Sequence, residues 1–187
     1  MPPKTEPSYL PTLFYTVRSH IALENYDAAL ALLPSDSTDT QVRALRSLAS
    51  YFETEDDADK YLEELRDLCI EIEEGYEGEE GDGMGSGLIK VAAATAFINE
   101  EELEEALTTL GAGLTCRDIE RLGKILHASL LAHRSVHSVA LIVQVYLSIN
   151  RPDLAKKEYD AAKKWADDSL LIQLIEASIG LAVVSLY

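Results

Sequence analysis

Apolar residues recur three and four positions apart along nearly the whole chain of 187 residues, the spacing that gathers side chains on one face of an α-helix. No stretch shows the strict apolar and polar alternation that marks a half-buried β-strand. The pattern therefore predicts an all-α protein. The expected helices cover residues 10–21, 28–33, 42–52, 58–72, 88–98, 103–110, 119–130, 139–149, 154–166 and 170–187.

Three of the predicted turns lead into a helix with an alanine about one turn from its start, namely Ala29, Ala106 and Ala155. A small residue there lets the two helices of a hairpin approach closely, as in tetratricopeptide repeats. The alanines are 77 and 49 positions apart, against a repeat of about 34 residues, so the repeats are degenerate. We expect a tetratricopeptide-like solenoid of helical hairpins, an alpha-alpha superhelix, that forms a single array over residues 1–187.

Three segments depart from this expected array. Residues 1–9 are rich in proline and are expected to form a flexible N-terminus. Residues 73–87 are rich in glutamate and glycine, and their charge repulsion and backbone freedom predict a flexible loop. Residues 114–137 predict an atypical insertion. The indole of Trp165 is expected to fill the core between stacked hairpins.

The charge balance of the chain narrows the class of partner. Its 33 Asp plus Glu and 16 Lys plus Arg give a formal net charge of −17, which argues against nucleic acid and anionic lipid surfaces. Only two cysteines are present and the N-terminus lacks the apolar region of a secretory signal, so a cytosolic protein is expected. Gln173 and Glu176 interrupt the apolar stretch 170–187, which favours a buried helix over a membrane span.

The candidate chemical motifs fail on their spacing. His133 and His137 share a helix face, but His127 lies about 80–120° away around the helix, so no zinc or copper site is expected. Cys116 lacks the signature of a catalytic thiol. The glycine run 81–87 follows no strand, is surrounded by carboxylates and lacks the spacing of a calcium loop. The sequence predicts no catalytic residue, no cofactor and no metal, and hence a scaffold that is not an enzyme.

Several segments together resemble the epsilon subunit of the coatomer, the COPI vesicle coat, and the alanine-rich helices resemble a fungal-type member. The segments that carry the resemblance are Leu13-Phe14-Tyr15, 26–33, 104–110, the turn and helices of 139–159 (VALIVQVYLSINRPDLAKKEY), Trp165 and 168–174.

The resemblance implies a structural, protein-binding subunit of the coatomer coat in Golgi to ER retrograde and intra-Golgi transport. Its expected partner is the C-terminal region of the coatomer alpha subunit, which the helical array would wrap. Other coatomer subunits would be contacted indirectly, and a membrane only through the assembled coat. Such a protein would be cytoplasmic and peripheral on Golgi and coat vesicle membranes.

Exposed positions on the first helix of each hairpin would line the concave, partner-binding side of such an array. The candidates are Tyr15, Arg18, Arg43, Lys90 and Gln144. The alternative is a generic tetratricopeptide adaptor that binds a peptide of another partner, such as an acidic tail. That adaptor would need a basic clamp, and the first helices offer few lysines or arginines.

The chain departs from the family in two places. Residues 114–137 match nothing expected between the third and fourth hairpins. The family also continues beyond the position of Ala182, so we expect either that the chain is truncated at its C-terminus or that another molecule covers the last helix. The cover would be a partner or a second copy, because an apolar terminal helix otherwise exposes a sticky face.

Overall fold

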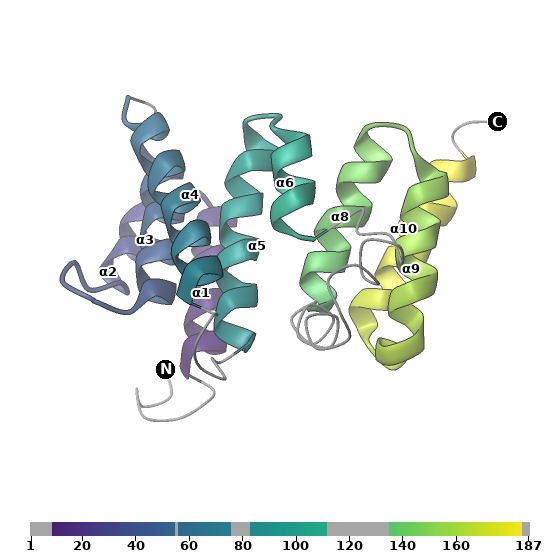
Figure 1. Ribbon diagram of the computed structural model, residues 1–187, viewed down its shortest axis with the longest axis horizontal. Coiled ribbons are helices and arrows are strands. Elements are labelled where there is room, and N and C mark those ends of the chain that lie inside the picture. Colours follow the sequence, from purple (N-terminus) through teal and green to yellow (C-terminus); the bar gives the residue numbers. More distant parts are fainter. Residues whose placement is uncertain (1–8, 55, 76–82, 112–134, 185–187) are drawn as a thin grey trace. The chain divides into compact units, whose positions relative to one another are not determined.

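The computed structural model describes residues 9–54, 56–75, 83–111 and 135–184, and within these ranges every regular element is a helix (Figure 1). The prediction of an all-α fold is confirmed. Contacts divide the chain into two compact units, Met1–Ala96 and Phe97–Tyr187. The helices are α1 (Tyr9–Ala22), α2 (Tyr26–Ala31), α3 (Thr40–Glu53), α4 (Ala58–Gly75), α5 (Gly83–Asn99), α6 (Leu103–Thr109), α8 (Val136–Ser148), α9 (Pro152–Ala166) and α10 (Leu170–Val184).

The first unit is built from paired helices around a core of their apolar stripes. α1 packs against α2 and α3, α2 packs against α3, and α3 packs against α4 (Figure 1). The helical spacing of the apolar residues places them on the faces that meet. Core side chains that are at most 3% exposed include Leu13, Phe14, Val17, Ala29, Leu33, Ala44, Leu45, Leu48, Ala49, Leu65 and Leu68.

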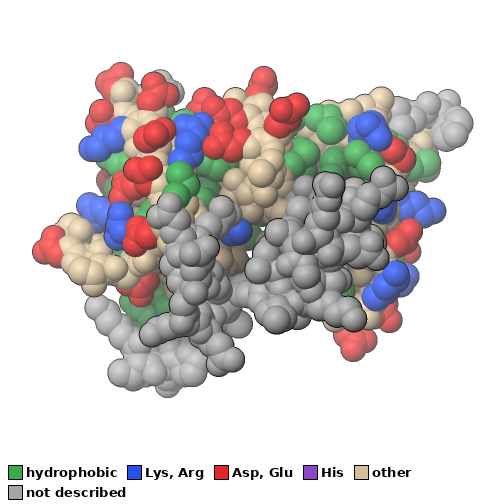
Figure 2. All heavy atoms as spheres, viewed as in Figure 1, with side chains coloured by type: hydrophobic (Ala, Val, Ile, Leu, Met, Phe, Trp, Pro, Cys, Tyr) green, Lys and Arg blue, Asp and Glu red, His purple; other side chains and the backbone are tan. Residues whose placement is uncertain are grey.

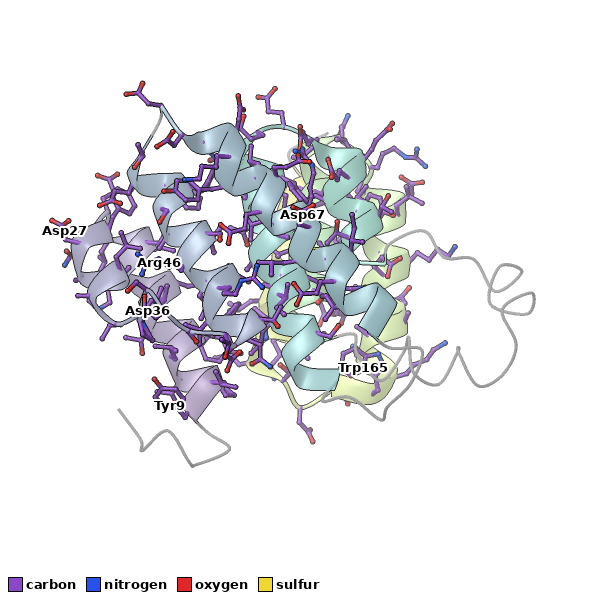
Figure 3. All side chains as sticks on the ribbon, turned by 60° about the vertical axis from the view of Figure 1, so that its left-hand side comes forward. Tyr9, Asp27, Asp36, Arg46, Asp67 and Trp165 are labelled. Atoms are coloured by element: carbon purple, nitrogen blue, oxygen red, sulfur yellow. The ribbon has the colours of Figure 1, made fainter. Side chains whose placement is uncertain are left out.

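Two polar contacts hold α3 in place at its start and against the first hairpin. The carboxylate of Asp39 caps α3 by accepting a hydrogen bond from the amide of Gln41 at 2.9 Å. Arg46, labelled in Figure 3, donates from Nη1 to the carbonyl oxygen of Leu33 at 3.1 Å. Since carbonyl groups at the end of a helix lack partners within it, this contact satisfies one of them just beyond α2.

The second unit contains α6, α8, α9 and α10. α8 packs against α6, α9 and α10, and α9 packs against α10 (Figure 1). A helix that is apolar almost all round needs cover on more than one side, and these neighbours provide it for α8. The side chains that α8 buries are Ser138, Val139, Ile142, Val143, Val145 and Tyr146.

The turns that precede α2, α6 and α9 share one backbone geometry. Each contains one residue other than glycine in the left-handed region, with φ of 57° at Glu24, 62° at Glu101 and 57° at Asn150. In each turn the next amide donates to the carbonyl five residues earlier, the closing bond of a Schellman motif. The three bonds are Asn25 to His20 at 2.9 Å, Glu102 to Phe97 at 2.9 Å and Arg151 to Tyr146 at 2.7 Å.

A fully buried alanine follows each of these turns at the same place. Ala29, Ala106 and Ala155 are each the fourth residue of their helix, and each is 0% exposed. A larger side chain at such a position would push the helix away from its neighbours. The shared turn and the shared alanine confirm the predicted tetratricopeptide-like hairpins.

The helices are longer than expected around the acidic, glycine-rich segment 73–87. α4 continues to Gly75 and α5 begins at Gly83, so both ends of that segment are helical, while residues 76–82 lie outside the described residues. Ser86 and Gly87 are buried, and packing of this kind overrides the low helix propensity of glycine.

Other expectations about the organisation of the chain have different outcomes. α1 already begins at Tyr9, and the predicted insertion 114–137 lies outside the described residues up to 134. The single array over residues 1–187 stays a prediction. The expectation for Trp165 was wrong, because this side chain, labelled in Figure 3, is 51% exposed. It lies on α9 about 60–80° from the stripe of Ala155 and Ala162 that packs inward.

Candidate partner-binding surface

Two of the predicted contact residues, Tyr15 and Arg18, lie one turn apart on α1. Tyr15 is 44% exposed, and its ring meets the ring of Phe14 edge to face, with centroids 5.6 Å apart. The guanidinium of Arg18 lies 5.5 Å from the centroid of the Phe14 ring, a cation–π distance. Phe14 itself is buried, so it is a fixed platform that holds both side chains at the edge of the core.

Burial acts on the titration of both groups. It raises the pKa of the Tyr15 hydroxyl above 10.0, and the nearby positive charge of Arg18 opposes this. Burial also lowers the pKa of the Arg18 guanidinium below its ordinary value, and the nearby Tyr15 opposes this. Because arginine stays protonated in proteins, Arg18 supplies a partly desolvated positive charge beside a phenol. Such a pair suits a partner with a hydrogen-bond acceptor or a carboxylate.

Arg43 has a different setting, on α3. Its Nη1 atom forms an ion pair with Oε2 of Glu71 in α4 at 3.2 Å, and both side chains are partly exposed. An exposed pair of this kind contributes little to stability. A partner that used Arg43 would therefore compete with Glu71 for its guanidinium.

Lys90 and Gln144 can be compared with residues of the other hairpins by counting back from the left-handed residue of each turn. Gln144 lies six residues before the left-handed residue of its turn and is exposed, and Arg18 has the same position in the first hairpin. Lys90 lies eleven residues before its left-handed residue, where the other two hairpins have Leu13 and Val139, both 1% exposed. Lys90 is accordingly half-buried. Its charged end must extend out of a position that is core elsewhere.

Within the first unit, the structure therefore brings together Tyr15 and Arg18. Arg43 is on a neighbouring helix of the same unit and Gln144 belongs to the second unit. The sequence analysis did not identify the buried Phe14 ring as the support for Tyr15 and Arg18. The spacing of Phe14, three and four residues from other apolar residues of α1, marked it only as a core residue. The clue available was the position of Arg18, four residues after Phe14 on one helix face.

Within the part of the chain that the structure describes, no three His, Cys, Asp or Glu side chains are grouped as metal ligands. His127, His133 and Cys116 lie outside these residues, and His137 lies in the first turn of α8. No helix within the same residues has the length and apolar character needed to span a membrane. On the face shown in Figure 2, Lys and Arg are scattered among Asp and Glu.

Comparisons with known proteins agree with this architecture. The family profile of the coatomer epsilon subunit matches residues 2–122 and 123–186. Coatomer subunit epsilon-1 of Arabidopsis thaliana is 25% identical over 166 residues, and the match covers 89% of this chain and 47% of that protein. Coatomer subunit epsilon of Dictyostelium discoideum is 27% identical over 177 residues, covering 93% and 48% of the two chains.

The chain thus spans about half the length of the relatives that it matches. A second Arabidopsis relative, coatomer subunit epsilon-2, is 24% identical over 166 residues. The family is named for a component of a coat and not for a reaction, which agrees with the prediction of a scaffold without enzymatic activity. The tetratricopeptide-like hairpins and the profile match over nearly the whole sequence lead to one conclusion. This chain belongs to the coatomer epsilon subunit family.

Proposed function

We propose that this chain is a structural subunit of the COPI coat and binds the C-terminal region of the coatomer alpha subunit. The observation that carries the proposal is the match to the coatomer epsilon family over residues 2–186, on a chain built from repeated helical hairpins. Helical-repeat proteins use such surfaces to hold extended or helical segments of other proteins. Cytoplasmic residence and attachment to Golgi and vesicle membranes through the assembled coat are part of this proposal.

The first helix of each hairpin supplies the contacts in this proposal. On α1 the Tyr15 and Arg18 pair offers an exposed aromatic ring and a partly desolvated charge, the side-chain types that most often anchor protein interfaces. Gln144 is the exposed equivalent of Arg18 on α8. These three side chains rank above Arg43, which is paired with Glu71, and above Lys90, which is half-buried.

Calorimetric titration with the alpha C-terminal region tests the proposal. The unmodified chain should bind, and Tyr15→Ala and Gln144→Glu should each weaken binding by about tenfold or more if they are anchors. Lys157→Glu is the matched control, since Lys157 is exposed on the second helix of its hairpin. No binding by the unmodified chain at about 100 µM, well above the dissociation constants of specific complexes, would refute the proposal.

The alternative, a generic adaptor for acidic tails, has less support. A carboxylate clamp needs basic side chains available on the first helices. Of these, Arg43 pairs with Glu71 and Arg46 donates to the Leu33 carbonyl, so both are already engaged within the chain. Titration with an acidic C-terminal peptide separates the two functions, because the adaptor would bind it and the coat subunit would not.

A further inference from the structure

Arg18 differs from the other arginines that the structure describes in having no oxygen partner. A carboxylate or carbonyl oxygen of the chain pairs with each of the other four, Arg43, Arg46, Arg66 and Arg151. The guanidinium of Arg18 has the ring of Phe14 instead, and it forms no hydrogen bond or ion pair within the described residues. The difference is unexpected in a chain with 33 Asp plus Glu and 16 Lys plus Arg, where carboxylates are in excess.

The helix that carries Arg18 does not compensate its charge. α1 contains no Asp or Glu, and the side chains three and four positions before and after Arg18 are uncharged. Arg18 is half-buried, and the loss of hydration lowers the pKa of its guanidinium. Removing a charge from water is unfavourable unless an opposite charge or a hydrogen-bond acceptor replaces the lost water. A carboxylate from another molecule would supply both.

The contact with the Phe14 ring leaves the hydrogen-bond donors of Arg18 available. A guanidinium has five N–H donors in one plane, and its contact with an aromatic ring takes none of them. Two of these donors match the two oxygens of a carboxylate. The backbone amides of α1 around Arg18 donate within the helix, so they form no nest of free amides of the kind that captures a chain terminus. The arrangement therefore fits a side-chain carboxylate.

We propose that Arg18 binds the carboxylate of an Asp or Glu side chain in the C-terminal region of the coatomer alpha subunit. The exposed ring of Tyr15 lies one turn away on α1 and offers an apolar surface beside this contact. The proposal rests on the proposed function, because it names one contact of that complex. A single guanidinium holds one carboxylate, so the contact is not the clamp of several cations that an adaptor for acidic tails needs.

Calorimetric titration of the full chain with the alpha C-terminal region tests the contact. Arg18→Gln should weaken binding by about tenfold or more, because it leaves the carboxylate of the partner buried without a counter-charge. Arg66→Gln is the matched control, since Arg66 belongs to the same unit and pairs with Glu63 at 3.4 Å. Both substitutions change the net charge by the same amount, so they alter long-range attraction alike. Arg66→Gln should change the dissociation constant by less than about twofold.

A second set of variants identifies the chemistry of the partner group. Each Asp and Glu of the alpha fragment is replaced in turn by Asn or Gln. One replacement should weaken binding to the unmodified chain by about tenfold or more, but binding to Arg18→Gln by less than about twofold, because that contact is already lost. Arg18→Lys keeps the charge and loses the planar pair of donors, so its affinity should lie between those of the unmodified chain and Arg18→Gln.

The contrary results separate this contact from the proposed function. If the unmodified chain binds and Arg18→Gln binds equally well, the carboxylate contact is wrong while the complex stands. If Arg18→Gln weakens binding but no replacement in the fragment does, Arg18 meets a group other than a carboxylate, which also overturns the proposal. An unmodified chain that does not bind overturns the contact and the proposed function together. Circular dichroism should be the same for all variants, and if Arg18→Gln loses helical signal, full affinity of Arg18→Lys overturns the contact.

Discussion

Ala29, Ala106 and Ala155 show at the scale of single residues how this chain specifies its fold. Each is completely buried at the same point after a turn of the same geometry. Their role could be predicted from the sequence, because a small residue one turn into a helix is visible in a single chain. The position of the Arg18 guanidinium beside the Phe14 ring could not be predicted, because only the packed core shows that Phe14 is fixed there.

We expect Ala155→Leu to lower the free energy of unfolding by about 1–3 kcal/mol, because a larger side chain cannot be placed in a packed core without strain. Ala161 lies on the exposed side of the same helix, so Ala161→Leu should change stability by less than about 0.5 kcal/mol. Urea denaturation monitored by circular dichroism measures both. Equal effects of the two substitutions would contradict the close approach of the helices at Ala155.

The carboxylate of Asp153, in the first turn of α9, should titrate at a pKa of about 2. Hydrogen bonds from the Arg151 guanidinium are the main cause, with Nε 2.9 Å from Oδ1 and Nη2 2.8 Å from Oδ2. Since the folded pKa is depressed, any stabilisation is present above the unfolded value of about 3.9 and is lost as the pH falls towards 2. Carbon-detected NMR titration should show a higher pKa in Arg151→Gln and an unchanged one in Lys157→Gln.

At the scale of elements, the helices and most of their pairings could be predicted because apolar periodicity is decided within a segment. The end of α4 and the start of α5, around residues 73–87, could not be predicted, because glycine and charge indicate a loop there. The start of α5 depends on burial that the local sequence does not show. The exposure of Trp165 was missed for a related reason. Its hydrophobicity suggests the core, but its angle around α9 takes it off the buried stripe.

The shared left-handed turn predicts that a glycine substitution has different effects on stability at two positions only three residues apart. Glu101 has φ of 62°, where a side chain is strained and glycine is not. Glu101→Gly should therefore leave the free energy of unfolding unchanged or raise it by up to about 1 kcal/mol. Glu104→Gly, inside α6, should lower it by about 1 kcal/mol, since glycine disfavours a helix. Thermal denaturation of both variants checks this, and a loss of stability in Glu101→Gly would contradict the strain.

At the scale of the whole molecule, net charge and exposed apolar surface have opposite effects on association, which charge repulsion opposes and apolar surface favours. The chain carries −17 while α10 offers an uncharged, apolar side. The sequence indicated both features. It could not show which side of α10 is exposed, because apolar residues occur on every side of α10 and only its packing on α8 and α9 distinguishes them.

The three matching turns also bear on how such chains diverge. Glu24, Glu101 and Asn150 adopt one conformation, although the alanine that follows is the one nearby residue that all three turns share. One turn geometry is thus compatible with many different amino-acid sequences. Substitutions at such turns can therefore leave the path of the chain unchanged, and a count of identical residues will understate how similar in structure two proteins built from them are.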